Sequence, residues 1–93
     1  MSTASVRFHE GAIADTKSAT DWYQERSAQA ALGFIDELAK AIEVIREAPA
    51  RWPMGVSRTR RFQLSRFPFS IIYSEDELMV TIWAVAHASR RPE

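Results

Sequence analysis

The 93-residue chain contains no cysteine, which excludes disulfide bonds, a thiol nucleophile and a zinc–thiolate centre. Its two histidines, His9 and His87, are too few for a metal site of histidine alone, and we predict neither a metal nor a cofactor. No apolar run approaches the roughly 18 residues that a membrane-spanning helix needs. The N-terminus also lacks the basic start and apolar stretch of a signal peptide. The sequence therefore predicts a cytoplasmic protein with no membrane association.

Basic side chains are scarce in the first half of the chain and acidic ones in the second, although the net charge is zero. Residues 1–50 hold five basic and eight acidic side chains, whereas residues 51–93 hold seven and four. Every cation of the second half is arginine, which binds phosphates and carboxylates in bidentate geometry. Two interpretations follow, a solvated surface or one docking surface for an anionic macromolecule. We favour the second and expect no small-molecule substrate.

Hydrophobic periodicity predicts a single domain that comprises residues 1–93. Residues 6–9 alternate between apolar and polar side chains, which indicates a short strand. A helical pattern extends from residue 12 to residue 48 and ends before Pro49. Ser27 is a good N-cap within this pattern, so we predict a hairpin of two helices.

The two predicted helices differ in their apolar faces. The first has a weak face of small residues, and its rings Trp22 and Tyr23 are expected to anchor it in the core. The second has an amphipathic stripe that includes Phe34 and Leu38. Its opposite face is charged and is expected to face solvent.

The second half of the chain changes to strand periodicity. Residues 50–57 form a loop by their proline and glycine content. Strands are predicted at residues 60–64, 69–73 and 78–86, with a polar turn at 74–77, and the last strand is apolar enough to be central. The order β-α-α-β-β-β predicts an α+β fold in which the helical hairpin packs on a small antiparallel sheet.

A cluster of basic side chains is the candidate site. Alternation places Arg61 and Gln63 on the face of their strand opposite to Phe62 and Leu64. The arginines near His87 would bind an anion, and His87 is the natural acid–base group. The rings of Tyr73 and Trp83 are expected in the core. The candidate target-binding residues are Arg60, Arg61, Arg66, His87, Arg90 and Arg91.

Six segments together resemble the RelE/ParE superfamily of bacterial toxins, the toxin halves of type II toxin–antitoxin, or plasmid stabilisation, modules. The segments are 21–27 (DWYQERS), 34–45, 48–53 (APARWP), 60–64 (RRFQL), 67–73 (FPFSIIY) and 82–92 (IWAVAHASRRP). The resemblance covers nearly the whole chain from Val6. The resemblance implies the same α+β fold and a cognate antitoxin that forms a hetero-oligomeric complex with the chain.

The resemblance also implies where the antitoxin would bind. Antitoxins of this superfamily wrap an extended helix-and-strand tail around the toxin, and such tails are often acidic. A helical hairpin on a sheet leaves an apolar groove and a sheet edge that would accept a helix and a strand. The candidate antitoxin-binding residues are Trp22, Tyr23, Phe34, Leu38, Tyr73 and Trp83.

The resemblance leaves three functions open. The ribonuclease-like branch carries an arginine in an Arg-Leu-Val-Tyr-like segment, where this chain has Ser70, so we favour the ParE-like branch, which poisons DNA gyrase without being an enzyme. The alternative is a ribosome-dependent mRNA endonuclease, with His87 as acid–base catalyst and Arg61 or Arg66 on the phosphate. A third interpretation is a degenerate member that binds its antitoxin without toxicity, because the aromatic and arginine residues that often follow this C-terminal motif are missing here.

Overall fold

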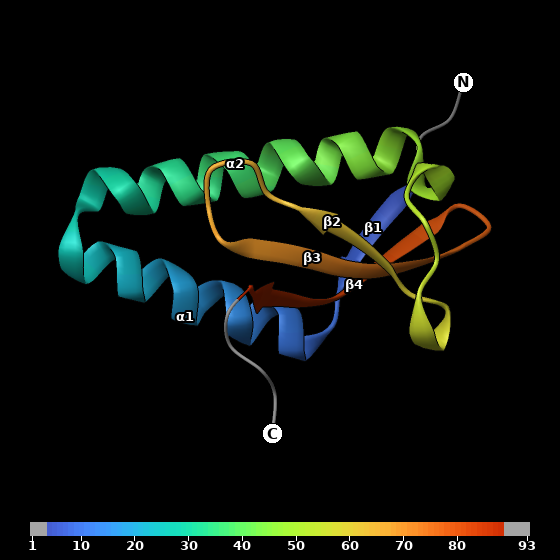
Figure 1. The fold of residues 1–93 in the computed structure, drawn as a ribbon, viewed down its shortest axis with the longest axis horizontal. Coiled ribbons are helices and arrows are strands. Elements are labelled where there is room, and N and C mark those ends of the chain that lie inside the picture. Colours follow the sequence, from blue (N-terminus) through green and yellow to red (C-terminus); the bar gives the residue numbers. More distant parts are fainter. Residues whose placement is uncertain (1–3, 89–93) are drawn as a thin grey trace.

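The computed structural model describes residues 4–88, and its helices and strands follow the predicted order (Figure 1). The strands are β1 (Ser5–Phe8), β2 (Arg60–Gln63), β3 (Phe69–Asp76) and β4 (Met79–His87); the helices are α1 (Glu10–Arg26) and α2 (Ala28–Glu47). Short 3₁₀ turns occupy Pro49–Arg51 and Val56–Arg58 in the predicted loop. The α+β class and the helical hairpin are confirmed.

Ser27 divides the two helices, as predicted. Its backbone is extended, and its Oγ accepts a hydrogen bond of 3.1 Å from the N–H of Ala30, which caps α2. Its own N–H donates to the carbonyl of Tyr23 and closes the last turn of α1. One residue therefore ends the first helix and begins the second.

The first helix begins at Glu10, two residues earlier than predicted, because His9 caps it. The Nδ1 atom of His9 accepts a hydrogen bond of 3.0 Å from the N–H of Gly11. A Cβ at Gly11 would lie 3.3 Å from the Nδ1 atom of His9 and 3.4 Å from the carbonyl oxygen of Trp83, so a side chain here would crowd the capping histidine.

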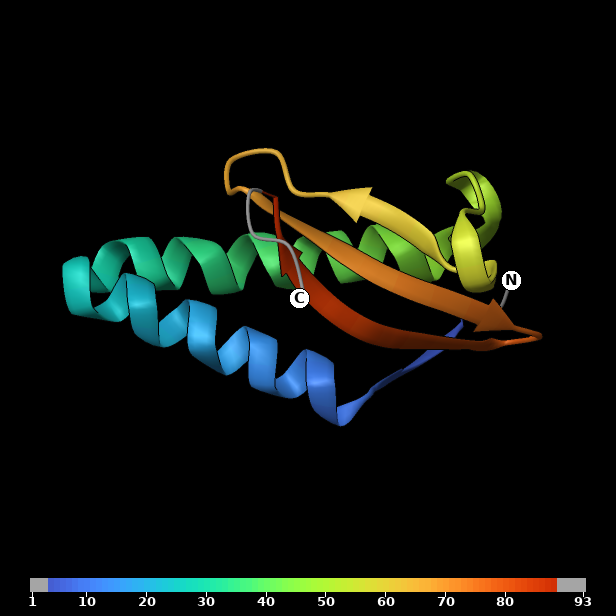
Figure 2. The ribbon, with the colours of Figure 1, turned by 60° about the horizontal axis from the view of Figure 1, so that its bottom comes forward.

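The four strands form one sheet in the order β1-β4-β3-β2. The three C-terminal strands are an antiparallel meander, as predicted, with Phe69 opposite His87 and Arg61 opposite Ile72. Strand β1 lies beside β4 and is parallel to it, so the sheet is mixed. The crossover between these two parallel strands contains both helices and the other two strands (Figures 1 and 2).

The hydrophobic core lies between α2 and one face of the sheet. The buried side chains of α2 pack on those of β3 and β4; they are Phe34, Leu38, Ala41 and Ile45 from the helix and Ile71, Tyr73, Val80 and Ile82 from the strands. Tyr23, Phe67 and Phe69 surround Phe34, with ring centroids 5.2–5.5 Å from its own. Each large apolar side chain buried in this way contributes about 1.5–3 kcal/mol.

Three sequence predictions about this region are wrong. Trp22 and Trp83 are 45% and 40% exposed, so neither ring belongs to the core. Trp83 turns outward because the register shifts beside it: Ile82 pairs with Tyr73 and Ala84 with Ile72, which leaves Trp83 without a partner across the ladder. The predicted turn at 74–77 is also misplaced, since β3 continues to Asp76 and the chain reverses at Glu77, where φ is 54°.

The cap of α1 makes a testable contribution to stability. Replacing His9→Ala removes the acceptor for the N–H of Gly11, and we expect a loss of about 1 kcal/mol, or roughly 4–8 °C in Tm for a domain of this size. His9→Asn restores an acceptor and should recover most of the loss in thermal unfolding. An equal loss in both variants would instead assign the effect to the ring contact of His9 with Trp83, whose centroids are 5.1 Å apart.

Candidate functional site

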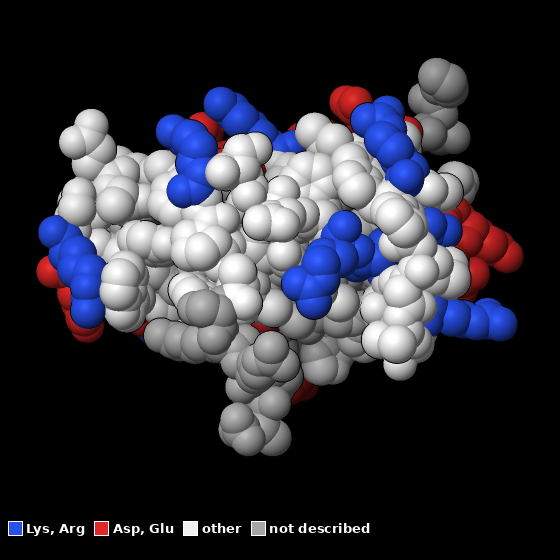
Figure 3. Space-filling view, in the orientation of Figure 1, with Lys and Arg blue, Asp and Glu red and all other residues white. Residues whose placement is uncertain are grey.

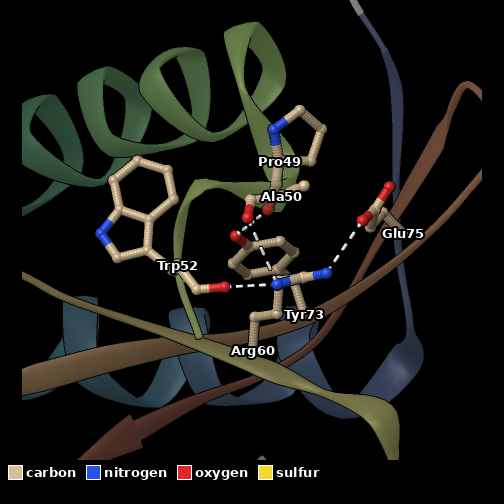
Figure 4. A network of polar contacts seen from close by, with 6 residues as sticks. All are labelled: Pro49, Ala50, Trp52, Arg60, Tyr73 and Glu75. Carbon is tan, nitrogen blue, oxygen red and sulfur yellow. Dashed lines mark hydrogen bonds and ion pairs between the residues drawn. The ribbon is translucent and has the colours of Figure 1, made fainter. Parts of the chain in front are cut away.

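Arg60 lies inside the structure and is occupied by internal partners (Figure 4). Its guanidinium pairs with Glu75 at 3.2 Å and donates to the carbonyl oxygens of Ala50 and Trp52. The side chain is only 13% exposed. The predicted role of Arg60 in target binding has no support in this geometry, because its charge is used to hold the chain after α2 against the sheet.

Tyr73 of β3 completes this network. Its hydroxyl donates a hydrogen bond of 2.6 Å to the carbonyl of Pro49. Burial raises the pKa of Tyr73, opposed by the charge of Arg60 and reinforced by that of Glu75, so the hydroxyl stays protonated and remains a donor. The segment after α2 is therefore fixed to β2 and β3 by buried polar contacts.

Arg66 is held by an acidic residue of α2. Glu37 accepts hydrogen bonds from the Nε of Arg66 at 3.0 Å and from the backbone N–H groups of Ser65 and Arg66. The Glu37 side chain is only 13% exposed, although its helix position predicts a solvent-facing residue. These bonds fix the connection between β2 and β3 to the second helix.

Arg61 and His87 project from opposite faces of the sheet. Arg61 is exposed and alternates with Phe62, which packs against the core, so Arg61 lies on the face that α2 leaves uncovered. His87 packs edge-on against Phe69, at 5.0 Å between ring centroids, and Phe69 packs in turn on Phe34 of α2. Arg61 and His87 are thus not brought together as a phosphate-binding arginine and an acid–base histidine, and the alternative pairing of His87 with Arg66 stays a prediction.

The basic side chains form no single patch on the face of the described residues that Figure 3 shows. Figure 3 shows lysines and arginines at separate places on one face of the molecule, with uncharged surface between them. Arg90 and Arg91 lie outside the described residues. The continuous basic docking surface that the sequence predicts is therefore not present on this face, and elsewhere it stays a prediction.

A groove lies between α1 and the C-terminal half of β4. It has a volume of about 550 Å³, and its walls are mostly small and aromatic side chains. The lining residues are Asp15, Ser18, Ala19, Trp22, Tyr23, Pro68, Phe69, Ala84, Val85, Ala86 and His87. The groove exists because β1 pairs with β4 only as far as Ile82, so the edge of β4 beyond that residue has no neighbouring strand among residues 4–88.

Asp15 occupies one position on this edge of β4. Its Oδ2 accepts a hydrogen bond of 3.0 Å from the N–H of Val85. Backbone groups alternate in direction along a strand, so the carbonyl of Val85 and the N–H and carbonyl of His87 point toward the same edge. The sequence does not identify Asp15, because only the tertiary arrangement brings it to β4.

The six predicted antitoxin-binding residues are divided between core and surface. Phe34, Leu38 and Tyr73 are buried in the chain's own core, where a partner docked on this fold would not reach them. Trp22 and Tyr23 line the groove, and the guanidinium carbon of Arg26 lies 3.6 Å from the centre of the Trp22 ring. Trp83 lies outside the groove, and its Nε1 donates to the Oγ of Ser74 at 2.8 Å.

Residues 4–88 contain neither a metal-binding cluster nor a membrane-spanning helix. No group of three or more histidine and carboxylate side chains there would hold a metal ion. None of the described helices is both long and apolar enough to cross a membrane.

Comparison with known proteins identifies the family. The family model described as the ParE toxin of the type II toxin–antitoxin system parDE matches residues 6–92. The chain belongs to the ParE toxin family. Among solved structures, a chain of the chromosomal ParDE toxin–antitoxin system from P. aeruginosa is similar in fold: the TM-score is 0.81 at 19% identity, over 94% of this chain and 98% of that one. A comparison with curated proteins gives no match.

The contacts of Glu37 make the stability of this ParE-family chain sensitive to acid. Burial raises the pKa of Glu37, but the hydrogen bonds from Arg66 and Ser65 outweigh it and hold the pKa below the ordinary value of 4.5. The stabilisation is therefore complete above pH 4.5 and is lost as the pH falls through the lower native pKa.

Replacing Glu37→Gln should lower the free energy of unfolding by about 1–3 kcal/mol at pH 7. Urea unfolding at pH 7 and pH 3 should show the difference from the parent chain shrinking at the lower pH. Glu43→Gln, at a more exposed position of the same helix, is the matched control and should have little effect at either pH. A pH-independent deficit in Glu37→Gln would contradict the assigned role of the carboxylate.

Proposed function

We propose that the chain is the toxin of a type II toxin–antitoxin pair, that its cognate antitoxin neutralises it, and that the free chain acts on DNA gyrase without being an enzyme. The match of the ParE toxin family model to residues 6–92 is the observation that carries this proposal. The family description names a system of two components, which implies an antitoxin partner.

The groove beside α1 is the best candidate for the antitoxin contact. An extended segment laid along β4 would bond to the carbonyl of Val85 and extend the sheet by a strand. Its side chains would enter a space lined by Trp22, Tyr23 and Phe69. Aromatic side chains of this kind supply much of the binding energy at protein interfaces.

Two observations support a function other than RNA cleavage. Cleavage of an RNA backbone needs an acid–base group close to the cation that holds the phosphate, and here His87 and Arg61 lie on opposite faces. Ser70, which stands where the ribonuclease-like relatives carry an arginine, is 2% exposed and offers no cation. RNA cleavage is therefore the less favoured alternative, and expression of the chain distinguishes it from action on gyrase.

Expression of the full chain without an antitoxin should arrest bacterial growth, and the purified chain should cause gyrase to accumulate cleaved DNA. His87→Ala separates the two mechanisms. Cut transcripts that disappear in His87→Ala, with gyrase unaffected, would replace the proposal by the endonuclease. No growth effect from a well-expressed chain would favour a member that has lost toxicity.

The groove is tested through neutralisation. We expect Trp22→Ala to weaken the complex with the cognate antitoxin at least 10-fold, or about 1.4 kcal/mol, measured by calorimetry or by the antitoxin level that restores growth. Leu32→Ala is the matched control, because Leu32 is a 68% exposed apolar residue of α2 outside the groove. Equal affinity of both variants for the antitoxin would exclude the groove as the contact.

A further inference from the structure

Residues 54–60 form a small hairpin that projects from the start of β2, far from the connection between the two helices (Figure 1). Met54 pairs with Arg60 in an antiparallel bridge, and the N–H of Gly55 donates to the carbonyl of Thr59 at 2.7 Å. The N–H and hydroxyl of Thr59 both donate to the carbonyl of Val56. The tip is therefore a closed, hydrogen-bonded turn.

Two residues of the turn have backbone conformations that their residue types disfavour. Ser57 and Arg58 both have left-handed conformations, with φ of 58° and 60°. Two consecutive left-handed residues are the geometry of a type I′ turn, which strongly prefers Asn-Gly. A side chain in this conformation costs roughly 1–2 kcal/mol, and neither Ser57 nor Arg58 makes a side-chain hydrogen bond or ion pair with the described residues to offset it.

The base of the hairpin is fixed to the rest of the fold. Arg60 is fixed by Glu75 and by the carbonyls after α2, and Trp52 packs on Phe62 at 4.9 Å between ring centroids. The tip is consequently held in place by contacts in which the side chains of Ser57 and Arg58 take no part. Nothing in the fold requires serine and arginine at the two left-handed positions.

The tip presents apolar surface and positive charge together. Val56 is 85% exposed and Met54 is 52% exposed, and the exposed Arg58 lies two residues beyond Val56. A nucleic acid backbone would use the guanidinium but would gain nothing from the valine. A protein surface that offers a carboxylate beside an apolar recess matches both features.

From this combination we infer that the hairpin tip, defined as Met54, Val56 and Arg58, is a contact between the free chain and the protein on which it acts. The inference rests on the proposed function. None of the tip residues lines the groove beside α1, so target contact and antitoxin contact use different residues. Strained, exposed residues that persist without an internal role are typical of binding sites.

The strain allows function to be separated from stability. Ser57→Gly and Arg58→Gly each replace a left-handed residue by glycine, and each should raise Tm by roughly 2–6 °C. Ser57→Gly keeps the guanidinium and should arrest growth as the parent chain does. Arg58→Gly should lose at least 10-fold in growth arrest at equal expression, although it is the more stable protein, and should still bind the antitoxin.

Val56→Ser tests the class of partner, with Leu32→Ser on α2 as the control for an exposed apolar residue. A protein target predicts that Val56→Ser weakens growth arrest and Leu32→Ser does not. Full activity of Val56→Ser with loss in Arg58→Gly would overturn the protein contact in favour of a nucleic acid.

Other outcomes overturn the inference in distinguishable ways. If Arg58→Gly arrests growth fully, the tip is not the contact, whereas the proposed function stands. Equal losses in Ser57→Gly and Arg58→Gly would also overturn it, because the backbone rather than the guanidinium would then matter. If the parent chain causes no arrest, the proposed function fails and this inference fails with it.

Discussion

The difference in length between β4 and its neighbour β1 is the constraint on which the rest of the structure depends. Strand β4 has nine residues and β1 has four, so β1 covers only the first part of the edge of β4. The remaining edge would expose unpaired backbone groups, which is costly in a buried setting and invites unwanted pairing. Helix α1 lies along it instead, and the carboxylate of Asp15 satisfies the N–H of Val85. The groove is the part of this edge that α1 does not fill.

Some arginines of this fold bind internal partners and others are exposed, and the sequence alone does not distinguish the two kinds. Arg60 is surrounded by Glu75 and backbone carbonyls, and Arg66 is bound by Glu37. Each fixes a connecting segment against a regular element, as a planar group with several donors does well. Arg61 is exposed and has no side-chain hydrogen bond or ion pair within the described residues. The charge imbalance between the two halves of the chain is thus in part structural.

Local patterns predicted most of the fold, because they depend on neighbours in sequence. The stripe of α2, the cap at Ser27 and the alternation in β2 follow from periodicity and capping alone, and the family resemblance joins them into one topology. The exposure of Trp83 follows from a register shift between two strands, which no single strand encodes. Asp15 and Glu37 act across more than 25 residues of sequence, on Val85 and on the loop at Arg66. Predicting such contacts requires the relative positions of whole elements.

The backbone outside regular strand pairing is stabilised in different ways at the edge of β4 and at the hairpin before β2. Beside α1, the carboxylate of Asp15 from that helix, distant from β4 in sequence, accepts the hydrogen bond that a neighbouring strand would otherwise accept. At the hairpin of residues 54–60, buried contacts at the base hold a turn that Ser57 and Arg58 by themselves disfavour. Such a turn persists only where the surroundings over-determine it. Since Asn-Gly would satisfy the same backbone at lower free energy, folding alone does not account for an arginine at position 58, and the contact inferred outside the chain gives its side chain a role.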